Sequence, residues 1–127
     1  KKPRIKPPIN FMKHHRPARK FNRTKNQRAA LLRSLMLSLV VHNKIITTLA
    51  KAKEVRPHIE KLLTRSRIDN LANRRYISIQ IGPRAAKKLI EETAPKFKDR
   101  KGGYTRIIKM PPRLTDNAEM GIIEFVA

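Results

Sequence analysis

The longest regular pattern of apolar residues follows Thr24. Leucine, methionine and valine side chains recur every three or four positions as far as Val40, which places them along one side of a helix. The pattern predicts a helix over about 25–42 whose apolar stripe is buried against a core. Thr24 and Gln27 have the spacing of a capping box, which would bond two amides that the first turn leaves free.

A short strand and a second helix are predicted next. The β-branched residues at 45–48 suit one strand, and helical spacing then resumes through about Arg65. Pro57 lies inside this second helix and lacks the amide that would bond the carbonyl of Lys53. A kink or a late helix start is therefore expected.

The segment 70–81 carries two patterns at once. Leu71 and Arg75 have helical spacing, whereas the isoleucines at the end of the segment alternate as they would in a strand. Of the two interpretations we favour the helix. Gly82 then breaks the chain, and Pro83 suits the first turn of a further helix.

The last third of the chain predicts one short helix and two strands. The helix covers 85–93 and should end before Pro95. A basic stretch at 96–101 leads into the strands, at 104–110 and 121–126, which a loop of turn-forming residues separates. The expected fold class is therefore α+β: a small three-stranded sheet packed with about four helices, which cover one of its faces.

The charge of the chain distinguishes it from an ordinary small domain. Its 127 residues fit one domain, and a hydrophobic content of 39% supports a modest core. The chain holds 31 Lys and Arg against 9 Asp and Glu, a net charge of +22, and no acid precedes Glu54. Because such charge opposes formation of the compact state, it predicts a polyanionic partner.

The sequence divides into two parts at about residue 23. Residues 1–23 are predicted to form an extended basic arm, because they mix prolines with lysines and arginines and show no apolar periodicity. Residues 24–127 are predicted to form a single globular domain. An arm of this kind is typical of segments that become ordered on nucleic acid, and a floppy solubilising tail is the alternative.

Catalytic chemistry finds little support in the sequence. The chain has no cysteine, and His14 and His15 lack a neighbouring acid that would complete a metal site. His42 and His58 stand alone. We therefore expect no enzyme activity, no metal and no cofactor. The longest apolar run, 35–41, is too short to cross a bilayer, which predicts no membrane insertion.

Phosphate recognition is the remaining chemistry, since dense lysine and arginine bind a nucleic-acid backbone by releasing its counterions. Lys25, Arg28 and Arg33 should lie on or near the solvent side of the first helix, where they could meet phosphate. The six aromatic residues are scattered, without the paired rings of a sheet that stacks single strands. This distribution favours recognition of folded RNA by its shape.

Several ordered motifs give the chain a family resemblance from about Met12 to Val126. They occur at 13–16, 21–23, 27–33, 45–49, 51–54 and 102–109, with His42, Arg113, 116–118, Met120 and 123–124. In these motifs the chain resembles the bacterial-type large-subunit ribosomal protein L-seventeen family. The resemblance implies a small α+β domain with a basic N-terminal arm, bound to large-subunit ribosomal RNA near the mouth of the peptide exit tunnel. Neighbouring ribosomal proteins are implied as further partners, without a homo-oligomer.

Matched residue by residue, the resemblance implies RNA contacts that neutralise phosphates and hold RNA helices together. They are Lys13, His14, Arg16, Arg19, Lys20, Asn22, Arg23, Arg28 and Arg33. Further implied contacts are Lys51, Lys53, Arg74, Arg75, Arg100, Lys101, Arg106 and Arg113. Pro57, Thr115 and Glu119 depart from the family pattern, which leaves the local geometry there open.

Other functions fit the sequence less well than the one that this resemblance implies. A free nucleoid-type protein that compacts DNA would explain the charge, but the chain shows no repeat and no clear dimer face. A membrane-active basic peptide and an RNA-modifying enzyme fit less well. Residues 1–11 precede the usual family start, and we expect an organellar or lineage-specific extension, with an organelle slightly favoured over the bacterial cytoplasm.

Overall fold

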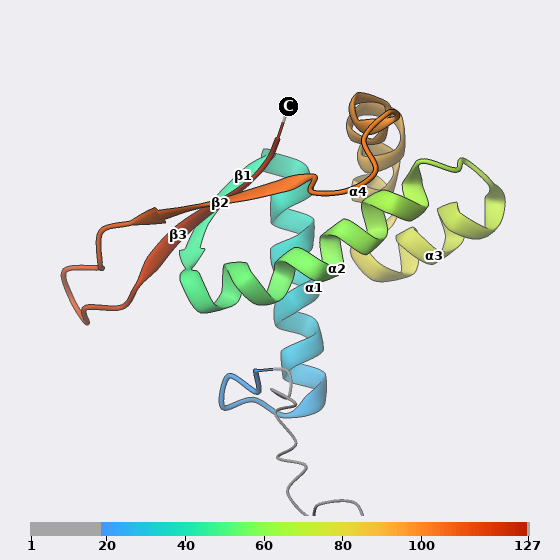
Figure 1. Ribbon diagram of the computed structural model, residues 1–127. Coiled ribbons are helices and arrows are strands. Elements are labelled where there is room, and N and C mark those ends of the chain that lie inside the picture. Colours follow the sequence, from blue (N-terminus) through green and yellow to red (C-terminus); the bar gives the residue numbers. More distant parts are fainter. Residues whose placement is uncertain (1–18, 127) are drawn as a thin grey trace, which may run out of the picture.

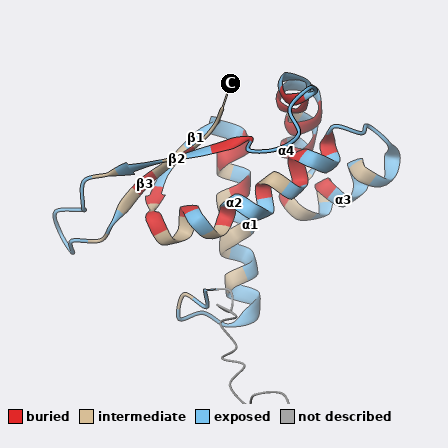
Figure 2. Cartoon of the chain, viewed as in Figure 1, coloured by how far each residue is buried: buried red, intermediate tan, exposed pale blue. Residues whose placement is uncertain are grey.

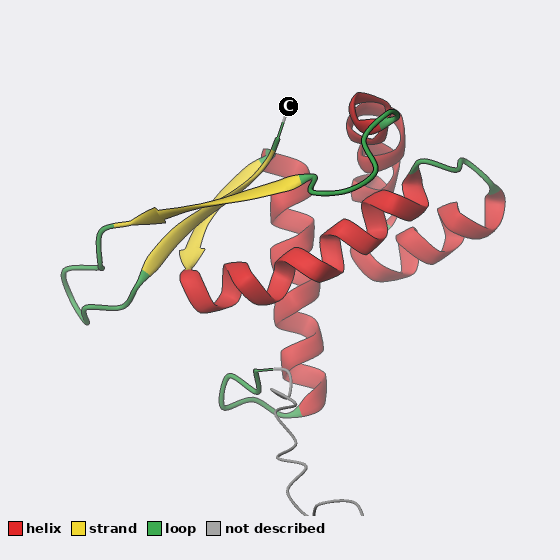
Figure 3. Cartoon of the chain, viewed as in Figure 1, coloured by secondary structure: helices red, strands yellow, loops and turns green. Residues whose placement is uncertain are grey.

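The computed structural model describes residues 19–126 of the chain. Residues 1–18 and Ala127 lie outside the described part, so only 19–23 of the predicted arm can be placed. The elements, in chain order, are α1 (Lys25–His42), β1 (Lys44–Thr48), α2 (Leu49–Ser66), α3 (Leu71–Ile81), α4 (Pro83–Lys88), a π-helical turn (Leu89–Thr93), a 3-10 turn (Ala94–Phe97), β2 (Thr105–Met110) and β3 (Met120–Phe125). Four α-helices and a three-stranded sheet confirm the predicted α+β class (Figures 1 and 3).

Helix α1 has the bounds that its apolar pattern predicts. The Thr24 amide donates to Gln27 Oε1 at 3.2 Å, as expected in a capping box. Asn43 ends the helix in the left-handed conformation, with φ of 63°, which asparagine tolerates better than most residues. Met36, Leu39 and Val40 are the buried residues of the helix, so its C-terminal half carries the core contacts.

Helix α2 begins at Leu49 and continues through Pro57 to Ser66, so of the kink or late start expected from that proline, the late start is wrong. Pro57 and Lys53 are both exposed, and water can therefore bond the Lys53 carbonyl that the proline leaves without an amide. The buried residues of α2 form one stripe that includes Val55, Ile59 and Leu63. The packing of this stripe keeps the helix continuous despite the proline.

The ambiguous segment at 70–81 is helical, as favoured. Ile77 is 0% exposed and Ile81 3%, whereas Ile79 between them is 70% exposed. On a strand all three would face the same side, but on a helix Ile79 points away from the other two. The Asn70 side chain accepts a bond from the Asn73 amide at 2.7 Å and caps the start of α3.

The helical path after Pro83 is longer than predicted. Helix α4 continues into the π-helical turn Leu89–Thr93 and then the 3-10 turn Ala94–Phe97, so the expected end before Pro95 is wrong. Pro95 lies in the first turn of that 3-10 segment, where the fixed φ of proline is compatible with a helical path. The change of helix type lets the chain accommodate the proline without leaving the core, in which Phe97 is buried.

The three strands are antiparallel in the order β1-β3-β2, so β3 is the middle strand. Ile123 of β3 is paired with Ile45 and Ile107 and is fully buried. Gly121, on the same face, leaves room for α2: a Cβ there would lie 3.4 Å from Leu49 Cδ1. This face therefore covers the core, which lies between the sheet and the crossing helices (Figure 2).

The opposite face of the sheet carries a second apolar row. Ile46, Ile122 and Ile108 lie in register across the three strands. Ile46 is 61% exposed and Ile108 is also exposed. Within residues 19–126 the helices therefore cover one face of the sheet, as predicted.

Candidate nucleic-acid interface

The residues that precede α1 lie against the start of α2. Arg19 Nη1 donates to the Ala50 carbonyl at 3.0 Å, and the Arg23 amide donates to the Lys20 carbonyl at 3.1 Å. Asn22, in this turn, has a φ of 50°. The turn leaves Lys20, Asn22 and Arg23 exposed. The described part of the predicted arm is therefore a defined structure that displays its cations to solvent.

This turn, the start of α1 and the first turns of α2 together form what we call the basic end of the domain. Its cations and polar groups are Arg19, Lys20, Asn22, Arg23, Lys25, Arg28, Lys51 and Lys53. Lys51 and Arg28 are half-buried and the others are exposed. No acid occurs in 19–53, so the positive potential here has no local compensation. Arg33 is exposed farther along α1.

Two of the predicted contacts are already paired with carboxylates. Arg74 Nε lies 2.5 Å from Asp69 Oδ1 and Arg74 Nη2 lies 2.7 Å from Asp69 Oδ2; Glu91 is 3.8 Å away. Arg113 binds Asp116 in the same bidentate way, at 2.9 and 2.6 Å. Their hydrogen bonds raise the pKa of both arginines and lower the pKa of Asp69. These two arginines hold local loops in place. Their charges are partly neutralised by the paired carboxylates, so they attract phosphate less strongly than unpaired cations do.

Asp116 should titrate in a way that reports its ion pair. The hydrogen bond from Arg113, assisted by the Ala118 amide, lowers the pKa of Asp116 from 3.8 to about 2. The ion pair is therefore fully formed above pH 3.8 and is lost as pH falls through about 2. We expect an NMR titration of this carboxyl to show a midpoint near 2, which moves towards 3.8 in Arg113→Gln. Arg74→Gln should leave it unchanged, and an unchanged midpoint in Arg113→Gln would contradict the assignment.

The other predicted contacts are dispersed. Arg75 is exposed on α3, and Arg100 Nη1 makes a long bond of 3.4 Å to the Val126 carbonyl. Arg106 lies on the outer face of the sheet, in register with Glu124. The structure thus gathers the predicted residues of the N-terminal half and separates most of the later ones. Lys13, His14 and Arg16 lie outside the described residues.

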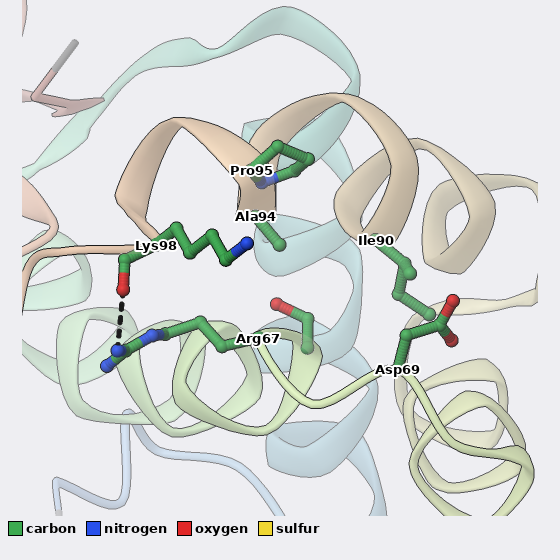
Figure 4. Close-up of a pocket in the computed structure, with 7 residues that line it drawn as sticks. Arg67, Asp69, Ile90, Ala94, Pro95 and Lys98 are labelled. Atoms are coloured by element: carbon green, nitrogen blue, oxygen red, sulfur yellow. Dashed lines mark hydrogen bonds between the residues drawn. The ribbon is translucent and has the colours of Figure 1, made fainter.

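A hollow of about 280 Å³ lies between the end of α2 and the 3-10 turn (Figure 4). Arg67 borders it and donates to the Lys98 carbonyl at 2.7 Å and to the Tyr104 hydroxyl at 3.3 Å. Ser66 Oγ donates to the Leu63 carbonyl at 2.8 Å. Arg67 thus ties the end of α2 to the chain before β2, Ser66 bonds within the last turn of α2, and the two do not form a nucleophile–base pair.

A larger and more open hollow, about 790 Å³, lies between α2, α3 and the chain before β2; we call it the α2–α3 groove. It is lined by Pro57, Glu60, Lys61, Thr64, Arg65, Tyr76, Lys101, Gly102 and Tyr104. Of these, the sequence identified only Lys101 as a contact. Lys61 and Arg65 have a helical spacing of four residues, which was a usable signal, but Tyr76 reaches them from another helix.

Among residues 19–126 no group of three or more His, Cys, Asp or Glu side chains is placed to hold a metal ion. No helix within that range is both long and apolar enough to span a membrane.

Fold and surface together define a small, strongly basic α+β domain with a group of cations at one end that no nearby acid in the sequence offsets. Its sequence matches the family pattern described as Ribosomal protein L17 over residues 31–126. The large ribosomal subunit protein bL17 of Campylobacter jejuni is 50% identical over 117 residues, which cover 91% of this chain and 100% of that protein. The bL17 protein of Nautilia profundicola is 48% identical, covering 91% of this chain and 98% of its own length.

The chain therefore belongs to the ribosomal protein L17 family, as the sequence motifs indicated. This family is structural and non-enzymatic, which agrees with the expectation that the chain is not an enzyme. These relatives are bacterial, so the organellar preference drawn from residues 1–11 gains no support.

Proposed function

We propose that the chain is a structural constituent of the large ribosomal subunit that binds and stabilises folded large-subunit rRNA. The observation that carries this proposal is the basic end of the domain, where 19–53 hold no acid and most of the cations are exposed. Phosphates brought against this end release counterions, which supplies binding free energy without reading the base sequence. Relatives of 48–50% identity are named as large-subunit proteins, which supports the same assignment.

The finer assignments extend this proposal. Lys13, His14 and Arg16 add phosphate contacts in the arm, 1–23, while 24–127 act as one domain. The family resemblance supports a site near the mouth of the peptide exit tunnel, beside other ribosomal proteins. The chain binds there as a single copy and without a cofactor.

Ultraviolet crosslinking in cells tests the proposal, together with sedimentation of the protein with ribosomal subunits after a high-salt wash. We expect crosslinks to concentrate on large-subunit rRNA and the protein to remain with that subunit. Crosslinks spread over DNA or messenger RNA, with loss of the protein in salt, would refute the proposal and favour a nucleoid-type protein.

A further inference from the structure

The α2–α3 groove contains a planar cation stacked on an aromatic ring. The Arg65 guanidinium carbon lies 3.9 Å from the centroid of the Tyr76 ring. Both side chains line the groove, Arg65 is exposed, and Tyr76 is 39% exposed. Such a pair offers flat, weakly hydrated surface, on which an unpaired nucleobase stacks well.

The charge of Arg65 is not used elsewhere in the described fold. Within residues 19–126 no carboxylate forms an ion pair with it. The acid that lines the groove, Glu60, is engaged by others: its Oε1 accepts from Thr105 Oγ1 at 2.9 Å and pairs with Arg56 Nε at 3.3 Å. The net charge that the groove presents to a ligand is therefore positive.

Two lysines from different segments border the same groove. Lys61 comes from α2, and Lys101 comes from the chain before β2. Both are exposed, so their ammonium groups can reach phosphates on either side of a bound base. A volume of about 790 Å³ is in the range of small-molecule sites and can accept one nucleotide.

The second tyrosine of the groove has a different role. Tyr104 is buried, its ring packs edge-on against Phe97 at 5.4 Å, and its hydroxyl accepts a bond from Arg67. It therefore forms part of the floor, and Tyr76 is the ring that a ligand can approach.

We propose that the α2–α3 groove binds one unpaired nucleotide of RNA, with its base stacked on the Arg65–Tyr76 pair and its flanking phosphates on Lys61 and Lys101. The inference rests on the proposed function and deepens it. The basic end binds folded RNA by its phosphates, whereas this groove recognises a base that has left its helix. Scattered aromatic residues do not reveal such a site in the sequence, because helix packing creates it.

The test uses the full chain bound to large-subunit rRNA, with ultraviolet crosslinks mapped by mass spectrometry and base edges probed chemically. We expect a nucleotide crosslinked at Tyr76 and protected from the probe. Tyr76→Leu should abolish the crosslink, expose that base and weaken binding roughly fivefold or more. Tyr76→Phe keeps the ring and should retain the crosslink and the protection. Arg84→Gln, on the exposed surface of α4, should leave the base protected.

The outcomes separate this inference from the proposed function. If the wild-type chain binds rRNA but no base is protected or crosslinked at the groove, or if Tyr76→Leu folds and protects the same base, the inference is wrong and the function stands. If the wild-type chain shows no preference for rRNA over DNA, the function fails as well. Thermal unfolding checks each variant, and the exposed pair Arg65→Gln with Lys101→Gln provides the test should Tyr76→Leu not fold.

Discussion

Replacing Ile123 by alanine should lower the free energy of unfolding by about 3 kcal/mol. Ile123 is 0% exposed in the middle strand, with Ile45 and Ile107 paired beside it on the two neighbouring strands. Truncation removes buried methyl groups and leaves a cavity, because the three strands and α2 cannot all shift to fill it. Urea unfolding of the purified chain, followed by circular dichroism, gives the magnitude.

Ile46→Ala is the matched control, since it is the same substitution in the same sheet but on the outer face. Ile46 is 61% exposed, so we expect a loss below about 1 kcal/mol. Equal losses in Ile46→Ala and Ile123→Ala would mean that the two faces of the sheet are buried alike, contrary to the fold described above.

The second large effect concerns binding of RNA at the basic end. We expect Arg23→Gln combined with Arg28→Gln to weaken binding to large-subunit rRNA by about tenfold per residue near 0.1 M salt. Both side chains lie where no acid competes for them. Because each lost phosphate contact releases one fewer counterion, the slope of log affinity against log salt should fall by about two. Filter binding across a salt series measures both quantities.

A control of equal charge is Arg84→Gln combined with Lys87→Gln, both exposed on α4 and outside the predicted contacts. This pair removes the same number of positive charges. It should therefore reproduce only the part of the affinity loss that comes from long-range electrostatics. If the two double variants weaken binding equally and change the slope alike, total charge rather than the basic end determines affinity, and the assignment of the interface is wrong.

Local pattern predicted the elements well because most of them have a single apolar stripe. The stripe of α1 indicated its bounds, and the turn-forming residues around 104–110 and 121–126 placed β2 and β3 to within a residue. The errors concern proline. At Pro57 and Pro95 the burial of neighbouring residues keeps the chain helical, and burial depends on distant partners that periodicity does not report.

The candidate site was less accessible to sequence reasoning. The acid-free N-terminal half predicted the basic end, since like charges close in sequence remain close on α1 and its preceding turn. Charge alone did not distinguish Arg113 from a free cation, although Asp116 three residues later was a usable signal. The contact of Arg65 with Tyr76 depends on how α2 and α3 pack, which no local pattern contains.

The position of β3 in the sheet has a consequence for the order of events during synthesis. β1 and β2 each pair with β3, and β3 is the last described element to be made. Until it emerges, both strands have unpaired edges, and the isoleucines of β1 remain accessible to other chains. The contacts among α1, α2 and α3 can form earlier. We therefore expect a nascent chain that acquires its helical half first and remains open to chaperones until its final strand closes the sheet.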